Sequence, residues 1–393
     1  MNQTVQKISA LEKKNILKLQ AAVFALVSAT FTNIYITQPV LPVLQTEFNV
    51  SPSQVSMTVS IVILGIVISN LFFGYLADKI SIHPVILAGG ICVASGGIIA
   101  SMTHDFRIFL MARLFQGLFI PALTTSLAAW LSKTLPGKRL NVVMGSYVSA
   151  TVLGGLGGRL LGGWIHPPLH WRYALVSASM LIIITMLFAY FTLPRTKPVK
   201  KSGRDETDGF FSFLQQKDLL LLFACGASGL LMFQPVFNFL PYRLAGPPFD
   251  FSTERITFTY FVYALGVFLG PFAGKLSDKI GSGNILIASS LVFFISLILL
   301  HIPSILGVIS GLLGICAGFF TIHATAVGLL NKKLTSGHGK ANALYVLFYY
   351  CGGWAGITGA GFCFEKSGWS GVLIFVMCFL IIPLTTGIIE KKQ

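Results

Sequence analysis

Twelve long apolar runs follow one another along the 393-residue chain, and each is long enough to cross a lipid bilayer. A helix needs about 20 apolar residues to span the hydrocarbon core. Because lipid offers no hydrogen-bonding partners, such segments must satisfy their own backbone as helices. Only 10% of the residues are charged, against about 25% in soluble domains. The sequence therefore predicts an all-α membrane protein with twelve transmembrane helices.

The expected spans fall into two groups of six. They cover residues 18–44, 53–78, 84–103, 106–132, 139–165 and 171–194, and then 217–242, 255–277, 284–301, 304–331, 338–364 and 368–389.

Two features divide the chain into halves. The longest polar stretch predicts a cytoplasmic linker at 195–216, between six-helix bundles at 1–194 and 217–393. FFGYLADKIS at 72–81 and FAGKLSDKIG at 272–281 share five residues at an offset of 200, each at the end of the second helix of its half. Such internal repeats are typical of transporters, in which two pseudo-symmetric bundles rock about a site between them.

The positions of the basic residues predict the orientation. With the N-terminus inside, 21 Lys and Arg lie at cytoplasmic ends and five at outer ends. This bias predicts that both termini lie in the cytoplasm. We expect a protein of the bacterial inner membrane. The net charge of +15 is spread in short clusters between apolar runs, which excludes a nucleic-acid partner. The expected partners are the bilayer, a small-molecule substrate and protons, and the protein is expected to be a monomer.

No pattern for catalysis or metal binding stands out. The six cysteines lie inside apolar runs without metal-ligand spacing, as small packing residues do. His166 and His170 flank two prolines, which prevent the helix that would align the two rings. The sequence contains no phosphate-binding glycine loop, nucleophile elbow or HExxH motif. We therefore expect no enzyme, no cofactor and no metal site.

Four motifs resemble those of the major facilitator superfamily, and specifically its twelve-helix drug/proton antiporter branch. They are QPVLP at 38–42, GYLADK at 74–79, RLFQG at 113–117 and GGLGGRLLGG at 154–163. The resemblance covers essentially the whole chain. It implies that helices 1, 4, 7 and 10 line a central cavity, with helices 2, 5, 8 and 11 at its sides. It also implies a role in conformational switching for Gly74, Asp78, Gly274 and Asp278.

The chain departs from the family pattern at two places. The motif after helix 2 usually continues Gly-Arg-Lys, whereas residues 81–83 read Ser-Ile-His. In helix 5, Arg159 stands where the antiporter motif has proline. The glycines around it recur at every fourth position, 154, 158 and 162, which lets a neighbouring helix backbone approach closely.

Ionisable groups deep in the membrane are few, and they are all basic. All thirteen acids lie in loops or at span ends, which leaves Arg113, Arg159 and His323 as the deep groups. At 1.5 Å per residue, both arginines lie about 10 Å below the outer edge. One interpretation is that they snorkel outward to headgroups or water. The other is that both face an aqueous cavity and bind a carboxylate or phosphate.

Further residues complete the predicted site, although each also fits ordinary helix packing. At similar depth to the arginines these candidates are Asn33, Tyr35 and Gln38 on helix 1 and Gln234 and Asn238 on helix 7. Tyr349 on helix 11 is a candidate aromatic wall, and His323 lies in the inner part of helix 10.

A cationic route favours the export of an anion. With the inside negative, one negative charge moving outward gains about 2.3 kcal/mol per 100 mV. We therefore expect a secondary transporter that works by alternating access and exports a small amphipathic or anionic compound, such as a polycarboxylate or siderophore. Proton antiport or the membrane potential would drive it. An importer of the same fold for a nutrient or siderophore is one alternative, and a non-transporting membrane receptor or scaffold is another.

Overall fold

The computed structural model describes residues 2–195 and 210–392, and no β-strand occurs among them. The elements in chain order are α1 (Asn2–Tyr35), η1 (Gln38–Val40), α2 (Leu41–Phe48), α3 (Pro52–Lys79), α4 (Ile82–Met102), α5 (Phe106–Leu123), α6 (Thr125–Thr134), α7 (Gly137–Ile165), α8 (Trp171–Thr192), α9 (Phe210–Gln215), α10 (Lys217–Ala245), α11 (Thr253–Thr259), η2 (Tyr260–Leu265), α12 (Gly266–Ile280), α13 (Ser282–His301), α14 (Ile305–Lys333), α15 (His338–Cys378) and α16 (Ile381–Lys392).

The predicted twelve spans are recovered once two special helices are counted correctly. Among the described residues, ten helical segments are long and apolar enough to span a membrane, and the pair formed by 253–270 and 272–280, bent by 45°, makes eleven. The segment His338–Lys392 is 55 residues long, but its backbone is non-helical at Ser367 and Gly368. A Cβ at Gly359 would lie 2.7 Å from the ring of Phe375, so the chain reverses there and forms two spans.

Local sequence signals set the helix ends. Ser51 caps α3 in a reciprocal capping box with Gln54, and Pro52 occupies the first turn, where its missing N–H costs nothing. Asp105 accepts hydrogen bonds from the first amides of α5. Gly368 adopts φ +56° at the reversal after span eleven, a conformation that glycine adopts without a steric penalty.

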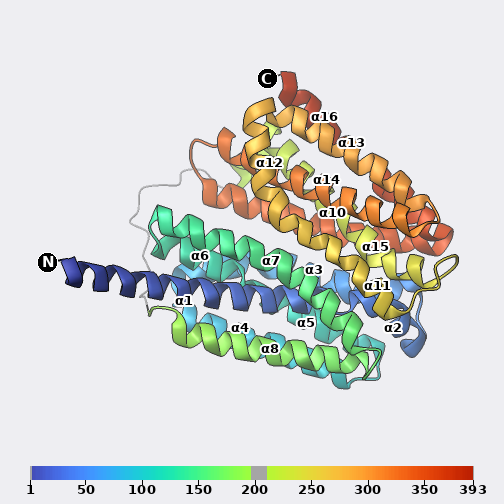
Figure 1. The fold of residues 1–393 in the computed structure, drawn as a ribbon, viewed down its shortest axis with the longest axis horizontal. Helices are drawn as coiled ribbons and strands as arrows, with labels where there is room; N and C mark the ends of the chain where they lie inside the picture. Colours follow the sequence, from blue (N-terminus) through green and yellow to red (C-terminus); the bar gives the residue numbers. More distant parts are fainter. Residues whose placement is uncertain (1, 196–209, 393) are drawn as a thin grey trace.

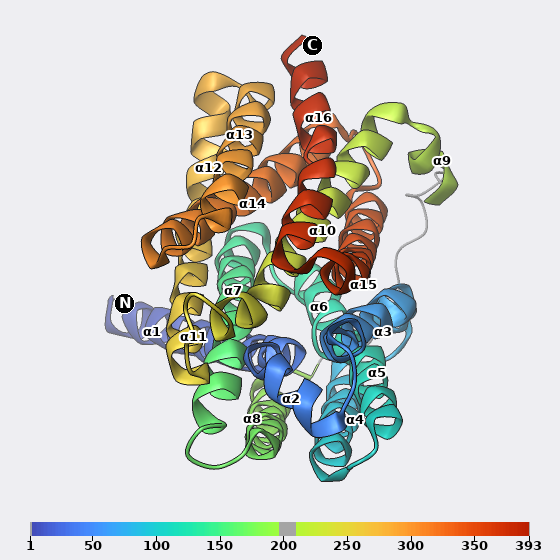
Figure 2. The same cartoon turned by 90° about the vertical axis from the view of Figure 1, so that its right-hand side faces the viewer.

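The helices form two groups that repeat one packing scheme (Figures 1 and 2). In the first half α1 packs on α7, and in the second α10 packs on α15. Side chains at Gly154 and Gly158 would collide with the α1 backbone, and at Gly352 and Gly356, 198 positions later, with the α10 backbone. The all-α fold of two pseudo-symmetric bundles is therefore confirmed. The helix backbone that approaches the glycines of helix 5 is that of α1. Most of the predicted linker at 195–216 lies outside the described residues.

The halves pack together through matched helix pairs. The α3 helix lies along α15, and α7 lies against α11 and η2. At one end of the molecule, η1 and α2 also touch α10. We call this the closed end. It carries Gln38, Ser53, Asn238 and Gly361, where a Cβ at Gly361 would lie 3.1 Å from Ser53. From there the two groups of helices diverge toward the end that carries the N-terminus (Figure 1).

Candidate functional site

Arg113 is completely buried inside the first half. Its Nη1 and Nη2 donate to the carbonyl oxygens of Asn33 and Ile34, both at 2.9 Å, and its Nε donates to that of Thr58 at 3.1 Å. A further bond of 2.6 Å joins Nη1 to Gln116 Oε1. In this structure the guanidinium is enclosed by groups of the first half and is exposed neither to a cavity nor to headgroups; a contact of Arg113 with cargo stays a prediction.

The carbonyl oxygens at the end of α1 provide the negative charge that a carboxylate would otherwise supply to Arg113. The last four carbonyls of a helix have no partner within it, and they carry partial negative charge that attracts cations. Because α1 ends at Tyr35, the carbonyls of Asn33 and Ile34 belong to this group. Arg113 therefore caps α1 from a neighbouring helix. The Asn33 side chain belongs to the same buried network, since its Nδ2 donates to Ala29 and Ala178 carbonyls.

Arg159 occupies a different environment, at the contact between the halves. It is fully buried, and no ion pair joins it to an acid in the described part of the chain. Its Nε donates to Gln38 Oε1 at 2.6 Å and its Nη1 to the Gly155 carbonyl at 2.8 Å, while Nη2 has no hydrogen-bond partner among the described residues. Ring centroids surround its Cζ at 4.3 Å (Tyr35), 4.4 Å (Tyr263), 5.5 Å (Phe237) and 5.6 Å (Tyr260).

Two hydrogen bonds cross between symmetry-related helices beside this cage. Gln38 Nε2 donates to Asn238 Oδ1 at 3.3 Å over a sequence separation of 200. Gln234 Nε2 donates to the Tyr35 hydroxyl at 2.5 Å over a separation of 199. Asn238 Nδ2 and Gln234 Oε1 are buried and have no hydrogen-bond partner in the part of the chain that the structure describes. The cage and these two bonds form the closed seal, which consists of Arg159, Tyr35, Gln38, Gln234, Asn238, Phe237, Tyr260 and Tyr263.

His323 and Tyr349 lie together on the second half, outside the closed seal. Both are half-buried, their ring centroids are 4.7 Å apart, and His323 Nδ1 is 3.0 Å from the Tyr345 hydroxyl. Phe319 stacks between His323 and Phe233, with centroids 6.1 Å and 3.9 Å away. Since Phe233 also touches Tyr263, a continuous row of rings leads from Arg159 to His323.

The residues expected to control switching lie at the opposite end of the bundle. Of the described residues, a Cβ added at Gly74 would meet only Thr125, at 3.8 Å, and one added at Gly274 would meet none within 4 Å. Asp278 accepts a hydrogen bond of 2.8 Å from Lys332 of its own half. The side chain of Asp78 lies outside the described set.

The profile of the Major Facilitator Superfamily matches residues 23–327. The chain belongs to the major facilitator superfamily. Among its relatives, the inner membrane transport protein YnfM of Escherichia coli K12 is 31% identical over 374 residues, covering 94% of this chain and 90% of that protein. The family is one of multi-pass membrane transporters, so the protein is a transporter.

Solved structures support the same fold. A bacterial homologue of the human lysosomal transporter Spinster, in an inward-facing and occupied conformation, superposes with a TM-score of 0.77 at 13% identity, over 97% of both chains. The nucleoside transporter NupG gives a TM-score of 0.75 at 13% identity, over 96% of this chain and 99% of that one.

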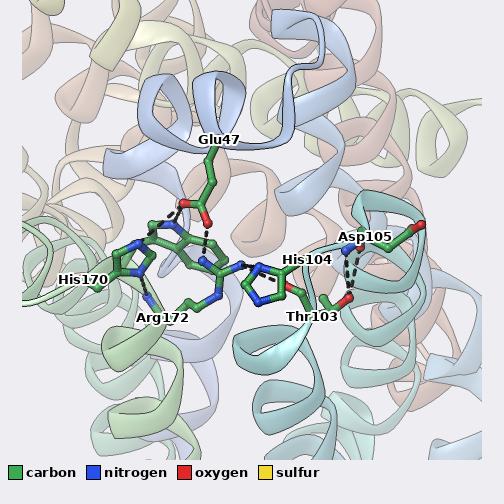
Figure 3. Close-up of polar contacts among 7 residues, drawn as sticks. Glu47, Thr103, His104, Asp105, His170 and Arg172 are labelled. Atoms are coloured by element: carbon green, nitrogen blue, oxygen red, sulfur yellow. Dashed lines mark hydrogen bonds and ion pairs between the residues drawn. The ribbon is translucent and has the colours of Figure 1, made fainter.

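A polar clamp that sequence reasoning missed fixes α2 to the first half of this superfamily fold. Glu47 accepts hydrogen bonds from Trp171 Nε1 and Arg172 Nη1, and His170 Nε2 lies 3.7 Å from its carboxylate (Figure 3). Arg172 also donates to the Thr103 carbonyl at 2.8 Å. The sequence shows Glu47 just after the first expected span and Trp171 and Arg172 at the start of the sixth, but nothing in it indicates that these three residues meet.

Removing the charge of Glu47 tests this clamp. Glu47→Gln keeps the shape but loses the charged partner of Arg172, and should cost about 1–2 kcal/mol because both side chains are partly buried. The thermal midpoint of the detergent-purified protein should fall by about 2–4 °C. Glu254→Gln, at an exposed position, should leave it unchanged. Equal midpoints for the two variants would show that the clamp contributes nothing.

Proposed function

We propose that this superfamily member is a secondary transporter that exports a small anionic or amphipathic organic compound across the bacterial inner membrane by alternating access. The observation that carries the proposal is Arg159, a buried guanidinium with one unpartnered nitrogen and no acid beside it among the described residues. The superfamily assignment supports transport, and the name of the YnfM relative supports the inner membrane.

Opening the closed seal would expose this cation to the route. To part the halves, Arg159 has to leave the rings of Phe237, Tyr260 and Tyr263, which come from the second half. A carboxylate or phosphate of the cargo then replaces the rings and binds the guanidinium. Because an unpaired buried cation costs several kcal/mol, an anion at this point stabilises the open form.

The distribution of basic residues supports the proposed direction of transport. Their bias puts the end that carries Gln38 outside and both termini in the cytoplasm. The closed seal is then an outer gate, and cargo enters from the cytoplasmic end, where Gly74, Asp78, Gly274 and Asp278 would control closure. An anion moving outward gains about 2.3 kcal/mol per charge and 100 mV, so export follows the membrane potential, with proton antiport as the second possible drive.

Arg159→Gln is expected to slow voltage-driven efflux of an anion about tenfold to a hundredfold, because a charge-assisted hydrogen bond contributes about 1.5–3 kcal/mol. Arg159→Lys should retain part of the rate. The measurement is efflux of labelled citrate and benzoate from proteoliposomes under an imposed inside-negative potential, with size-exclusion profiles to verify folding.

Reversing the potential distinguishes the alternatives. An exporter of anions slows when the inside becomes positive, whereas flux that ignores voltage and follows a pH gradient contradicts the anion mechanism. Uptake accelerated under the inside-negative potential would identify the importer. A receptor or scaffold gives no flux of either probe under any condition, and full activity of Arg159→Gln would remove the role assigned to that residue.

A further inference from the structure

A surface pocket of about 530 Å³ lies away from the closed seal, between α1, α7 and α8 of the first half. Its volume falls within the roughly 300–1,000 Å³ typical of small-molecule sites. It is at the same end of the bundle as Gly74, because α7 begins and α8 ends there, beside the middle of α1. The residues that line it are Ile16, Lys18, Leu19, Arg139, Phe191, Thr192 and Pro194.

The pocket lies at the level where the membrane-spanning segments begin and end. The spans expected from the sequence at 18–44 and 139–165 start at Lys18 and Arg139, and the span at 171–194 ends at Pro194. All three residues line the pocket. This level corresponds to the boundary between acyl chains and headgroups. A molecule in the pocket would therefore contact the headgroup region of the bilayer.

The lining separates into a cationic and an apolar part. Lys18 and Arg139 are exposed cations, and none of the described lining residues is acidic. Arg195, also exposed, directly follows the lining residue Pro194. On the apolar side, the ring of Phe191 is 78% exposed, which leaves its face available to an acyl chain.

We propose that this pocket binds an anionic phospholipid. Lys and Arg hold the phosphate by charge-assisted hydrogen bonds, and basic pockets between transmembrane helices at the cytoplasmic surface favour anionic headgroups. The ring of Phe191 and the side chain of Ile16 pack on the upper part of an acyl chain. A free phosphate ion would use only the cationic half of this lining, so the lipid is the ligand that matches both halves.

The bound lipid would link three helices of one half. Lys18 belongs to α1, Arg139 to α7 and Phe191 to α8, so one molecule would bridge them without touching the second half. Its binding is consequently independent of which end of the transporter is open, and it does not rest on the proposed export of anions.

Native mass spectrometry of the delipidated full-length protein tests the site, with phosphatidylglycerol and phosphatidylcholine of identical acyl chains as probes. The wild type should bind one phosphatidylglycerol more tightly than phosphatidylcholine. Lys18→Ala and Arg139→Ala should each weaken that binding about fivefold, equivalent to about 1 kcal/mol per cation. The double variant Lys18→Arg, Arg139→Lys keeps a cation at both positions and should bind phosphatidylglycerol as the wild type does. A control pair, Lys279→Ala with Lys391→Ala, removes two exposed charges from the other half and should leave that binding intact.

Three results would overturn the proposal. Equal binding of the two lipids would show that the headgroup is not recognised. An unchanged preference in the Lys18→Ala, Arg139→Ala double variant would show that the lipid binds at another site. Competition by glycerol 3-phosphate at the same concentration as phosphatidylglycerol would identify a free phosphate ester as the ligand. Phe191→Ala, which keeps both cations, should weaken the binding of phosphatidylglycerol and leave any binding of glycerol 3-phosphate unchanged.

Discussion

Replacing Arg113 by leucine is expected to lower the free energy of unfolding by about 3–5 kcal/mol, since removing one partner of a buried charged network costs about that much. The substitution leaves the carbonyls of Asn33, Ile34 and Thr58 buried without their donor, and each such group costs about 1–3 kcal/mol. The end of α1 would then fray or rotate, and with it Gln38 and the closed seal.

Thermal unfolding in detergent measures this effect. Arg113→Lys should recover only part of the loss, because an ammonium group is a compact point charge that cannot reproduce the guanidinium fork over three carbonyls and Gln116. Arg107→Ala, one helix turn or more away at an exposed position, is the matched control and should stay within about 0.5 kcal/mol of the wild type. An Arg113→Leu protein that unfolds at the wild-type temperature would refute the capping role.

The sequence predicts the depth of Arg113 but not its direction. Counting residues from the end of a span gives the depth of a side chain. The direction of that side chain depends on where the neighbouring helices end. The expected span 18–44 hides a break, since α1 stops at Tyr35 and a short turn, η1, follows at Gln38. Pro39 and Pro42 were the available signal, because proline interrupts a helix and leaves earlier carbonyls unpaired. If these two prolines are taken to mark a helix end, the free carbonyls of that end become the predicted partner of Arg113, which no acid provides.

The surroundings of Arg159 are only partly readable from sequence. The absence of a nearby acid follows from the positions of all thirteen carboxylates. The rings that enclose the guanidinium come largely from η2 and α10, about 80–100 residues further along, and no periodicity specifies that pairing. The 200-residue repeat was the indirect signal, because related positions of two pseudo-symmetric halves, such as Gln38 and Asn238, meet near the axis between them.

Gly158→Ala is expected to destabilise the protein by about 1–3 kcal/mol or more, the usual cost of forcing extra atoms into a packed interior. A methyl group there would collide with the carbonyl oxygen of Thr32 on α1, and backbone cannot rotate aside as a side chain can. The helices α1 and α7 would have to separate, which would displace the adjacent Arg159 from Gln38 and slow transport as well.

Gly145→Ala on the same helix is the matched control, because no described residue lies within 4 Å of a Cβ at that position. There the change should stabilise by up to about 1 kcal/mol, the helix propensity difference between glycine and alanine. The two variants are thus expected to move the thermal midpoint in opposite directions, although their chemistry is identical. If Gly158→Ala also raised the midpoint, the close approach of α7 to α1 would not be what these glycines provide, and the position of Arg159 beside Gln38 would need another cause.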